Sequence, residues 1–184
     1  MNQHDMTRNM VLAALFAALT AIGAFLQIPT GTVPITLQFL FTALAGLLLG
    51  WKWGAVSQLL YVGIGLLGLP VFTQGGGIGY VLQPSFGFLL GLIPAVAVIG
   101  ALTARRTGYL TVLAAVLVGD LILYAVGVPY MYLILHVYMQ SAKTFPALLA
   151  AMLVYVPGDT LKIIVVAALA PVLRRTLVKA VPNL

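Results

Sequence analysis

Six long apolar segments follow one another along this chain of 184 residues, and they restrict its fold more than any other feature. A helix needs roughly 17–25 mostly apolar residues to cross a hydrocarbon core of about 30 Å, and a shorter one crosses where the bilayer thins. The sequence therefore predicts an all-α integral membrane protein, a bundle of six transmembrane helices in one domain over residues 1–184. The segments cover residues 8–27, 36–50, 53–69, 84–103, 109–126 and 158–173.

The composition agrees with a membrane protein and excludes several other classes. Apolar side chains make up 62% of the residues and charged ones only 7%, against about 25% charged residues in soluble domains. The absence of cysteine excludes disulfides, thiolate metal sites and cysteine nucleophiles. The net charge of +6 does not indicate nucleic-acid binding, because the basic residues flank apolar segments instead of lining one aromatic-rich face. The first segment resembles a signal peptide, but we interpret it as retained because five more follow.

The Lys and Arg residues outside the apolar segments predict the orientation. The connections after the first, third and fifth segments contain one basic residue, Lys143. The termini and the other connections hold seven basic residues, namely Arg8, Lys52, Arg105, Arg106, Arg174, Arg175 and Lys179. By the positive-inside rule both termini are cytoplasmic, which requires an even number of spans and so agrees with six.

The three outer connections have unusual sequences. Residues 29–34 and 70–83 are rich in Pro and Gly, and residues 127–158 contain two apolar pieces at 130–138 and 146–156. We interpret these pieces as interfacial or re-entrant. They are the competing candidates for a seventh and an eighth span, but at 1.5 Å per residue neither crosses about 30 Å.

Two of the three acidic residues, Asp120 and Asp159, fall at membrane depth. A charged side chain there costs at least about 2.5–3.5 kcal/mol, so such residues usually face a partner or a cavity. Asp159 follows Pro157 and Gly158, a pattern typical of a helix start, and a simple N-cap is the alternative role. Lys162 stands three residues later on the same face, where the two charges can pair. We expect the pair to bind a ligand near the outer face, with a structural ion pair as the alternative.

Asp120 lies nearer the cytoplasmic side of its segment, and Tyr124 follows one helical turn later. A hydrogen bond between the two within the bundle is the expected arrangement. A structural role for Asp120 is as well supported as a functional one.

Neutral groups near the outer face are further candidates for ligand binding. Thr36 and Gln38 open the second segment and offer a hydroxyl and an amide, although capping explains Thr36 equally well. The loop GGGIGY suits a lid that closes over a ligand, with Gly77 and Gly79 allowing close approach and Tyr80 forming an aromatic wall. A plain tight turn explains the glycines equally well. His4 and His136 have no partners at metal-ligand spacing, so we assign no metal. Gln83 follows the loop.

A stripe of small residues marks the first segment. Small side chains four residues apart allow another helix to approach closely. Packing within the bundle would use the same pattern. The stripe includes Ala13, Ala14, Ala17 and Ala18.

Taken together, these motifs resemble the BioY family, the biotin-binding S components of energy-coupling factor (ECF) transporters. The resemblance extends over nearly the whole chain. It rests on the alanine stripe, PITLQ at 34–38, GGGIGYVLQPSFGFLLG at 75–91, GDLILYAVGVPY at 119–130 and PGDTLK at 157–162.

The resemblance implies a six-helix S component in a prokaryotic plasma membrane that captures biotin and is not an enzyme. Its partners would be a transmembrane coupling protein, contacted by the alanine stripe, and two cytoplasmic ATPases. Biotin would be the transported ligand, and no cofactor is implied. Asp159 would accept hydrogen bonds from the ureido group of biotin and Lys162 would bind its carbonyl or steady Asp159. Thr36, Gln38, Gly77, Gly79, Tyr80, Gln83 and Tyr124 would complete the pocket.

Three other functions remain open. An S component for a different vitamin would share the scaffold. A stand-alone carrier or channel would need no ATPase, although no inverted repeat is evident. An intramembrane protease is disfavoured because no suitable Ser–His or Ser–Lys arrangement, aspartate pair or HExxH motif occurs. For the carboxylate of biotin, the glycine-rich connection offers Gln74 and Gln83 but no arginine.

Overall fold

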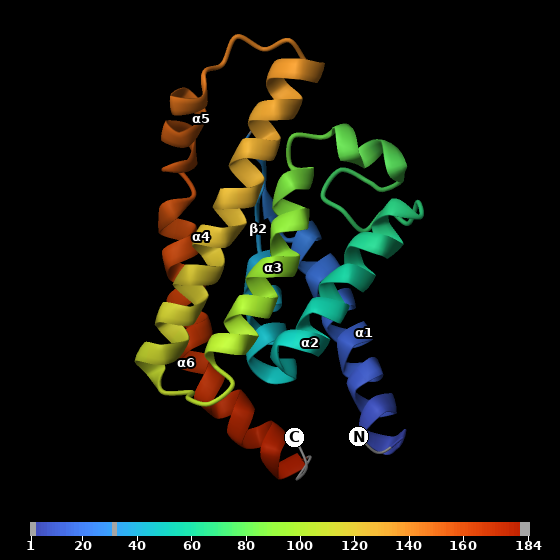
Figure 1. Ribbon diagram of the computed structural model, residues 1–184, viewed down its shortest axis with the longest axis vertical. Coiled ribbons are helices and arrows are strands. Elements are labelled where there is room, and N and C mark those ends of the chain that lie inside the picture. The colour runs from blue at the N-terminus through green and yellow to red at the C-terminus, as the bar shows by residue number, and fades with distance from the viewer. Residues whose placement is uncertain (1–2, 31–32, 181–184) are drawn as a thin grey trace.

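Long helices make up most of the structure, a computed structural model that describes residues 3–30 and 33–180 (Figure 1). Gly31 and Thr32, part of the first predicted outer connection, lie outside the described residues. The elements are α1 (Gln3–Phe25), β1 (Gln27–Ile28), β2 (Ile35–Thr36), α2 (Gln38–Leu66), the 3-10 helix η1 (Ile78–Leu82), α3 (Phe86–Leu102), α4 (Tyr109–Leu133), the π-helix η2 (Ile134–Tyr138), α5 (Phe145–Met152) and α6 (Val156–Ala180).

The helices confirm the prediction of an all-α chain with apolar segments that can cross a membrane. In the described part of the chain, four helical stretches are long and apolar enough to do so, and α3 is a shorter apolar helix of 17 residues. The four stretches are Gln3–Phe25, Gln38–Leu66, Tyr109–Tyr138 and Val156–Arg174.

Helix α2 spans both the second and third predicted segments, and a sharp break at Gly50 divides it. Gly50 has φ of +73° and ψ of −178°, a conformation that side chains with a Cβ rarely adopt. After the break the chain reverses (Figure 1). Side chains from the two halves meet in antiparallel register, with Thr42 donating to Gln58 at 3.1 Å and Gln38 donating to Tyr61 at 2.7 Å. The sequence prediction placed a loop here, and a single glycine makes the turn.

Helix α4 shows that one sequence prediction was wrong. Residues 130–138 were predicted to be a separate interfacial or re-entrant piece, but they continue α4 without interruption through Pro129 and into η2. Proline is tolerated inside membrane helices because neighbouring groups satisfy the carbonyl that it leaves free. Packing also favours the extension, since Val128, Met131 and Leu135 are buried against α5 residues Leu148 and Met152.

The chain reaches α6 through a short helix. Residues 146–156 form α5 and a tight turn, and α6 begins at Val156, so that Pro157 lies in its first turn. A proline in the first turn leaves no intrahelical hydrogen bond unmade, because the first N–H groups have no partner in the helix. The predicted interfacial or re-entrant position of this piece remains a prediction.

A chain of buried polar side chains joins α1 to both halves of α2. The Gln58 amide donates to Thr20 at 3.2 Å and to Ser57 at 3.1 Å, and Thr42 donates to Gln58. Thr20, Thr42, Ser57 and Gln58 are all fully buried. Because each buried polar group has partners, the cost of burying it is offset and the relative positions of the three helical segments are fixed.

Aromatic side chains hold the glycine-rich connection, residues 70–83, against the bundle. The ring of Phe72 contacts Tyr61 and Tyr80 at centroid distances of 5.5 and 4.6 Å. Phe72 is fully buried, and it fits only because Gly65 has no side chain: a Cβ there would lie 2.1 Å from the Phe72 ring. The backbone N–H of Gly77 also donates to the Gly65 carbonyl at 2.7 Å. This connection is therefore a fixed part of the structure.

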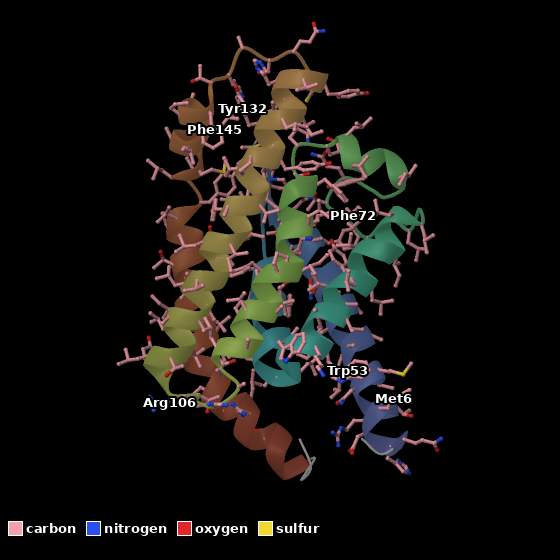
Figure 2. The ribbon with its side chains drawn as sticks, viewed as in Figure 1. Met6, Trp53, Phe72, Arg106, Tyr132 and Phe145 are labelled. Atoms are coloured by element: carbon pink, nitrogen blue, oxygen red, sulfur yellow. The ribbon has the colours of Figure 1, made fainter. Side chains whose placement is uncertain are left out.

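The two ends of the bundle differ in what they carry. Helix α1 begins and α6 ends at the same end of the molecule, which also carries the connection between α3 and α4 (Figure 1). Figure 2 shows Met6 and Arg106 toward this end, with Tyr132 and Phe145 at the opposite one. The rings of Tyr132 and Phe145 meet at 5.5 Å and pack the far part of α4 against α5.

Candidate ligand-binding site

A cavity lies between the start of α2, the glycine-rich connection, α3, α4 and the start of α6. The antiparallel pair β1–β2, in which Gln27 faces Thr36, places the 33–36 stretch at this cavity. Most of the lining is apolar or aromatic, with few polar groups, as is typical of small-molecule sites. The lining residues are Val33, Pro34, Ile35, Thr36, Gln38, Phe39, Thr73, Tyr80, Ser85, Phe88, Leu89, Leu92, Leu123, Tyr124, Met152, Tyr155, Asp159 and Lys162.

Asp159 and Lys162 form the charged centre of the cavity. The Lys162 ammonium lies 2.5 Å from Asp159 Oδ1 and donates to the Thr36 carbonyl at 3.2 Å. Both residues are more than nine-tenths buried. The predicted ion pair is therefore present. Each charge needs the other, because a buried charge without its partner is strongly destabilising. Asp159 is not the N-cap of α6, because the helix begins three residues earlier and the Asp159 N–H donates to Tyr155.

Tyr124 reaches this centre from α4. Its hydroxyl donates to Asp159 Oδ2, so each oxygen of the carboxylate has a protein donor. A carboxylate oxygen can accept two hydrogen bonds, so each oxygen of Asp159 keeps acceptor capacity for a ligand N–H group. The arrangement suits a neutral ligand group that donates hydrogen bonds.

The predicted hydrogen bond between Asp120 and Tyr124 is wrong, because the Tyr124 hydroxyl is used by Asp159. Asp120 is itself more than nine-tenths buried, and its Oδ1 has no hydrogen-bond partner in the part of the chain that the structure describes. Asp120 interacts electrostatically with both Asp159 and Lys162. Asp120 does not line the cavity, so it lies near the ion pair without being part of the site.

Thr36 and Gln38 lie beside the charged centre. The Thr36 hydroxyl donates to Gln38 Oε1 at 3.0 Å, and the Gln38 amide donates to the Tyr61 hydroxyl, which donates to the Val71 carbonyl at 3.1 Å. The side chain of Gln38 is thus held in one orientation. The Thr42 hydroxyl also donates a hydrogen bond to the backbone carbonyl of Gln38. This bond joins the site to the buried polar chain between α1 and α2.

The glycine-rich connection contributes a wall of the cavity, but not through all the predicted residues. Tyr80 lines the cavity, and its hydroxyl lies 2.9 Å from the Thr73 hydroxyl. Gly77, Gly79 and Gln83 do not line it, and Gln83 is exposed, as is Gln74. Gly77 instead has a φ of +98° and immediately precedes η1. Its role here is to shape the backbone that positions Tyr80.

Several lining residues were missed by sequence reasoning. Phe88, Leu89 and Leu92 lie on the face of α3 that turns to the cavity, below Ser85 just before the helix, and this spacing of three and four residues was visible in the sequence. Tyr155 lies just before α6, and its hydroxyl donates to the Val33 carbonyl. No local signal identifies Tyr155, because its role depends on contact with residues more than 120 positions away.

The alanine stripe of α1 divides between two environments. Ala13 and Ala17 are buried in the bundle, whereas Ala14 and Ala18 are exposed. Ala13 and Ala17 therefore serve the predicted internal packing, whereas contact with another protein remains a prediction. His136 stacks on Tyr132 at 5.3 Å, outside the cavity.

Comparisons with known proteins agree with this arrangement. The family model described as the BioY family matches residues 1–179. The chain belongs to the BioY family. Among BioY relatives, the probable biotin transporter BioY of Lysinibacillus sphaericus is 50% identical over 147 residues, which cover 79% of this chain and 75% of that protein. The biotin transporter BioY of Thermotoga maritima is 35% identical over 89% of this chain and 94% of its own length.

The fold is also shared with a solved structure. The crystal structure of the S-component for biotin from an ECF-type ABC transporter has a TM-score of 0.83 to this BioY chain. The two are 29% identical, and the match covers 95% of each chain. The S-component bundle is therefore the fold of this chain over nearly its whole length.

Proposed function

We propose that this chain captures biotin as the S component of an ATP-driven ECF importer. One observation carries the proposal: the cavity is mostly apolar, and its charged centre of Asp159, Lys162 and Tyr124 is built for a neutral hydrogen-bonding group. Membership of the BioY family and the match to a biotin S-component support biotin as that ligand.

The chemistry of biotin fits the arrangement of groups. Its ureido ring offers two N–H donors and one carbonyl acceptor, and its thiophane ring is apolar. Asp159 accepts from the ureido N–H groups, while the Lys162 ammonium donates to the carbonyl or holds Asp159 in place. Thr36 and Gln38 provide further polar contacts, and Phe88, Leu92 and Tyr80 surround the rings. Binding energy comes from apolar burial, and specificity comes from the few polar groups.

The chain works with partners and is not an enzyme. A transmembrane coupling protein and two cytoplasmic ATPases supply the energy for transport. The coupling protein contacts the exposed Ala14 and Ala18, whose small side chains allow another helix to approach closely. Ala13 and Ala17 support this face from within the bundle.

The protein crosses a prokaryotic plasma membrane six times, with both termini in the cytoplasm. The two halves of α2 count as separate spans because the chain reverses at Gly50, and α3 adds a short one. The connection between α3 and α4, which contains Arg105 and Arg106, lies at the same end as the start of α1 and the end of α6 (Figure 1), and this supports the orientation.

Equilibrium binding of labelled biotin to the detergent-purified chain tests the proposal. Saturable binding is expected, unaffected by excess thiamine or riboflavin. Asp159→Asn should weaken it by about tenfold or more, since hydrogen bonds to a charged group contribute about 1.5–3 kcal/mol. Asp5→Asn is the matched control, because Asp5 pairs with Arg8 on α1 far from the cavity.

Size-exclusion profiles and thermal unfolding establish that the variants are folded. Unchanged affinity in folded Asp159→Asn protein would reject this site, and displacement of biotin by another vitamin would reject the proposed specificity.

A further inference from the structure

Tyr61 lies behind the ligand site and joins two parts of its wall. It belongs to the second half of α2, is fully buried and does not line the cavity. Its hydroxyl accepts a hydrogen bond from the Gln38 amide at 2.7 Å and donates one to the Val71 carbonyl at 3.1 Å. Gln38 opens α2 and lines the cavity, and Val71 belongs to the glycine-rich connection. One hydroxyl group therefore fixes both parts relative to each other.

The Val71 carbonyl decides the direction of both hydrogen bonds. A carbonyl oxygen only accepts, so the single hydroxyl proton of Tyr61 points to it. The phenol oxygen is then left as an acceptor and needs a donor from Gln38. Of the two ends of the amide, only the NH2 group donates. The Gln38 Nε2 atom therefore faces Tyr61, and Oε1 faces the other way.

The other side of the Gln38 amide is the side of the ligand site. Thr36, which lines the cavity, donates its hydroxyl proton to Gln38 Oε1 at 3.0 Å. A carbonyl oxygen has two lone pairs, so Oε1 keeps room for one more donor. If the amide were turned over, the Tyr61 proton would have to serve both Oε1 and the Val71 carbonyl. The turned amide thus loses a hydrogen bond in a buried region, which is unfavourable.

Polar groups follow one another beside the cavity in an alternating order. The Asp159 carboxylate is an acceptor, and the Lys162 ammonium donates both to it and to the Thr36 carbonyl. Gln38 Oε1, which accepts from the Thr36 hydroxyl, is a second acceptor. The order acceptor, donor, acceptor is complementary to a cyclic urea, whose N–H, C=O and N–H groups are donor, acceptor and donor. A turned Gln38 amide would break this order.

We propose that Tyr61 is a positioning residue that determines specificity: it holds the Gln38 amide with its oxygen toward the ligand, and so selects a ligand N–H group. The inference rests on the proposed function, because the ureido ring of biotin supplies the N–H groups. Tyr61 does not itself touch the ligand and acts through Gln38. The edge-on contact of its ring with the buried Phe72 ring, at a centroid distance of 5.5 Å, keeps the hydroxyl in place.

Two ring analogues of biotin test this selection. In each, one of the two ureido N–H groups is replaced by a ring oxygen, so that a donor becomes an acceptor on one side of the ring. The unaltered chain should bind both about tenfold or more weakly than biotin, because an acceptor of the site is left unpaired. Tyr61→Phe frees the Gln38 amide to turn its NH2 group toward a ring oxygen. The preference for biotin should then fall to about threefold or less for one analogue, and stay unchanged for the analogue whose altered side faces Asp159.

A double-mutant cycle shows whether Tyr61 acts through Gln38. Tyr61→Phe alone should weaken biotin binding by about two- to tenfold, the range for one neutral hydrogen bond. In a Gln38→Met background, which has no amide to orient, the same change should alter the affinity by less than about twofold. Equal losses in the two backgrounds would show that the hydroxyl only supports the fold, and would overturn the proposal.

Tyr130→Phe is the matched control. The Tyr130 hydroxyl donates to the Val81 carbonyl at 2.6 Å, so this variant also removes a hydroxyl group from a carbonyl of the glycine-rich connection, but it leaves the Gln38 amide as it is. Its preference for biotin over both analogues should equal that of the unaltered chain, and thermal unfolding establishes that each variant is folded. If Tyr61→Phe keeps both preferences as well, the role of Tyr61 fails while the proposed function stands. If the unaltered chain binds no biotin, the proposed function fails, and this inference fails with it.

Discussion

Asp159 has a structural role in a buried ion pair in addition to the binding role proposed for it. Its carboxylate is buried with the Lys162 ammonium, so neither charge is left alone in a region of low dielectric constant. The Tyr124 hydroxyl fixes the other carboxylate oxygen from a different helix. The orientation of Asp159 is therefore set before a ligand arrives, and this preorganisation reduces the entropy lost on binding.

Removal of one hydroxyl group tests this preorganisation. Tyr124→Phe should weaken biotin binding by about tenfold, because a hydrogen bond to a charged acceptor contributes about 1.5–3 kcal/mol. Tyr132→Phe makes the same change on the same helix, at a ring that stacks on His136 away from the cavity, and it should leave affinity unchanged. Isothermal titration in detergent provides the measurement. Indistinguishable affinities for the two variants would contradict the role given to Tyr124.

At the scale of elements, the close approach of the glycine-rich connection to α2 decides the shape of one cavity wall. Phe72 fills the space beside Gly65 and also contacts Tyr80, which lines the site. Because the rings of Tyr61, Phe72, Tyr80 and Phe86 are in contact one after another, a displacement of Phe72 is transmitted to Tyr80. The position of this cavity wall therefore depends on the packing of these four rings.

A pair of glycine substitutions on α2 tests the packing. Gly65→Ala places a Cβ 2.1 Å from the Phe72 ring, and such overpacking typically costs about 1–3 kcal/mol. We expect a lower thermal unfolding midpoint and weaker biotin binding. Gly63→Ala is the control, because its Cβ would meet no atom within 4 Å and alanine favours a helix over glycine. Equal midpoints for the two variants would contradict the close approach.

At the scale of the whole molecule, the two ends of the bundle carry different parts of the chain. Both terminal helices and the connection between α3 and α4 lie at one end, whereas the connection between η2 and α5 lies at the other (Figure 1). The ligand site draws on the 33–36 stretch, the glycine-rich connection and the start of α6. We expect the end that carries the termini to face the cytoplasm.

The absence of native cysteine makes this orientation directly testable. Single cysteines at two exposed positions, Ala104→Cys and Ala142→Cys, are labelled in intact cells with a maleimide that does not cross membranes. Ala142→Cys should react at once, and Ala104→Cys only after the membrane is permeabilised. The reverse pattern would show that the bundle is inserted the other way.

The sequence by itself determined the helical class, the approximate limits of the apolar segments and the residues of the charged centre. These follow from local properties: hydropathy over one membrane thickness, and the spacing of three residues that puts Asp159 and Lys162 on one face. Thr36, Gln38, Tyr80 and Tyr124 were also named from the sequence, and all four line the cavity. Gly77, Gly79 and Gln83 were named as well but do not line it.

Only the tertiary structure decided which groups meet. From the sequence alone, Tyr124 could form a hydrogen bond with Asp120 on its own helix. Because α4 packs against α6, its hydroxyl donates to Asp159 instead. The continuation of α4 through Pro129 and the wall formed by Tyr155 likewise depend on neighbours distant in sequence. Local patterns contain the propensities of a segment, whereas hydrogen bonds between helices depend on how their faces pack, and this is settled only when the whole bundle has formed.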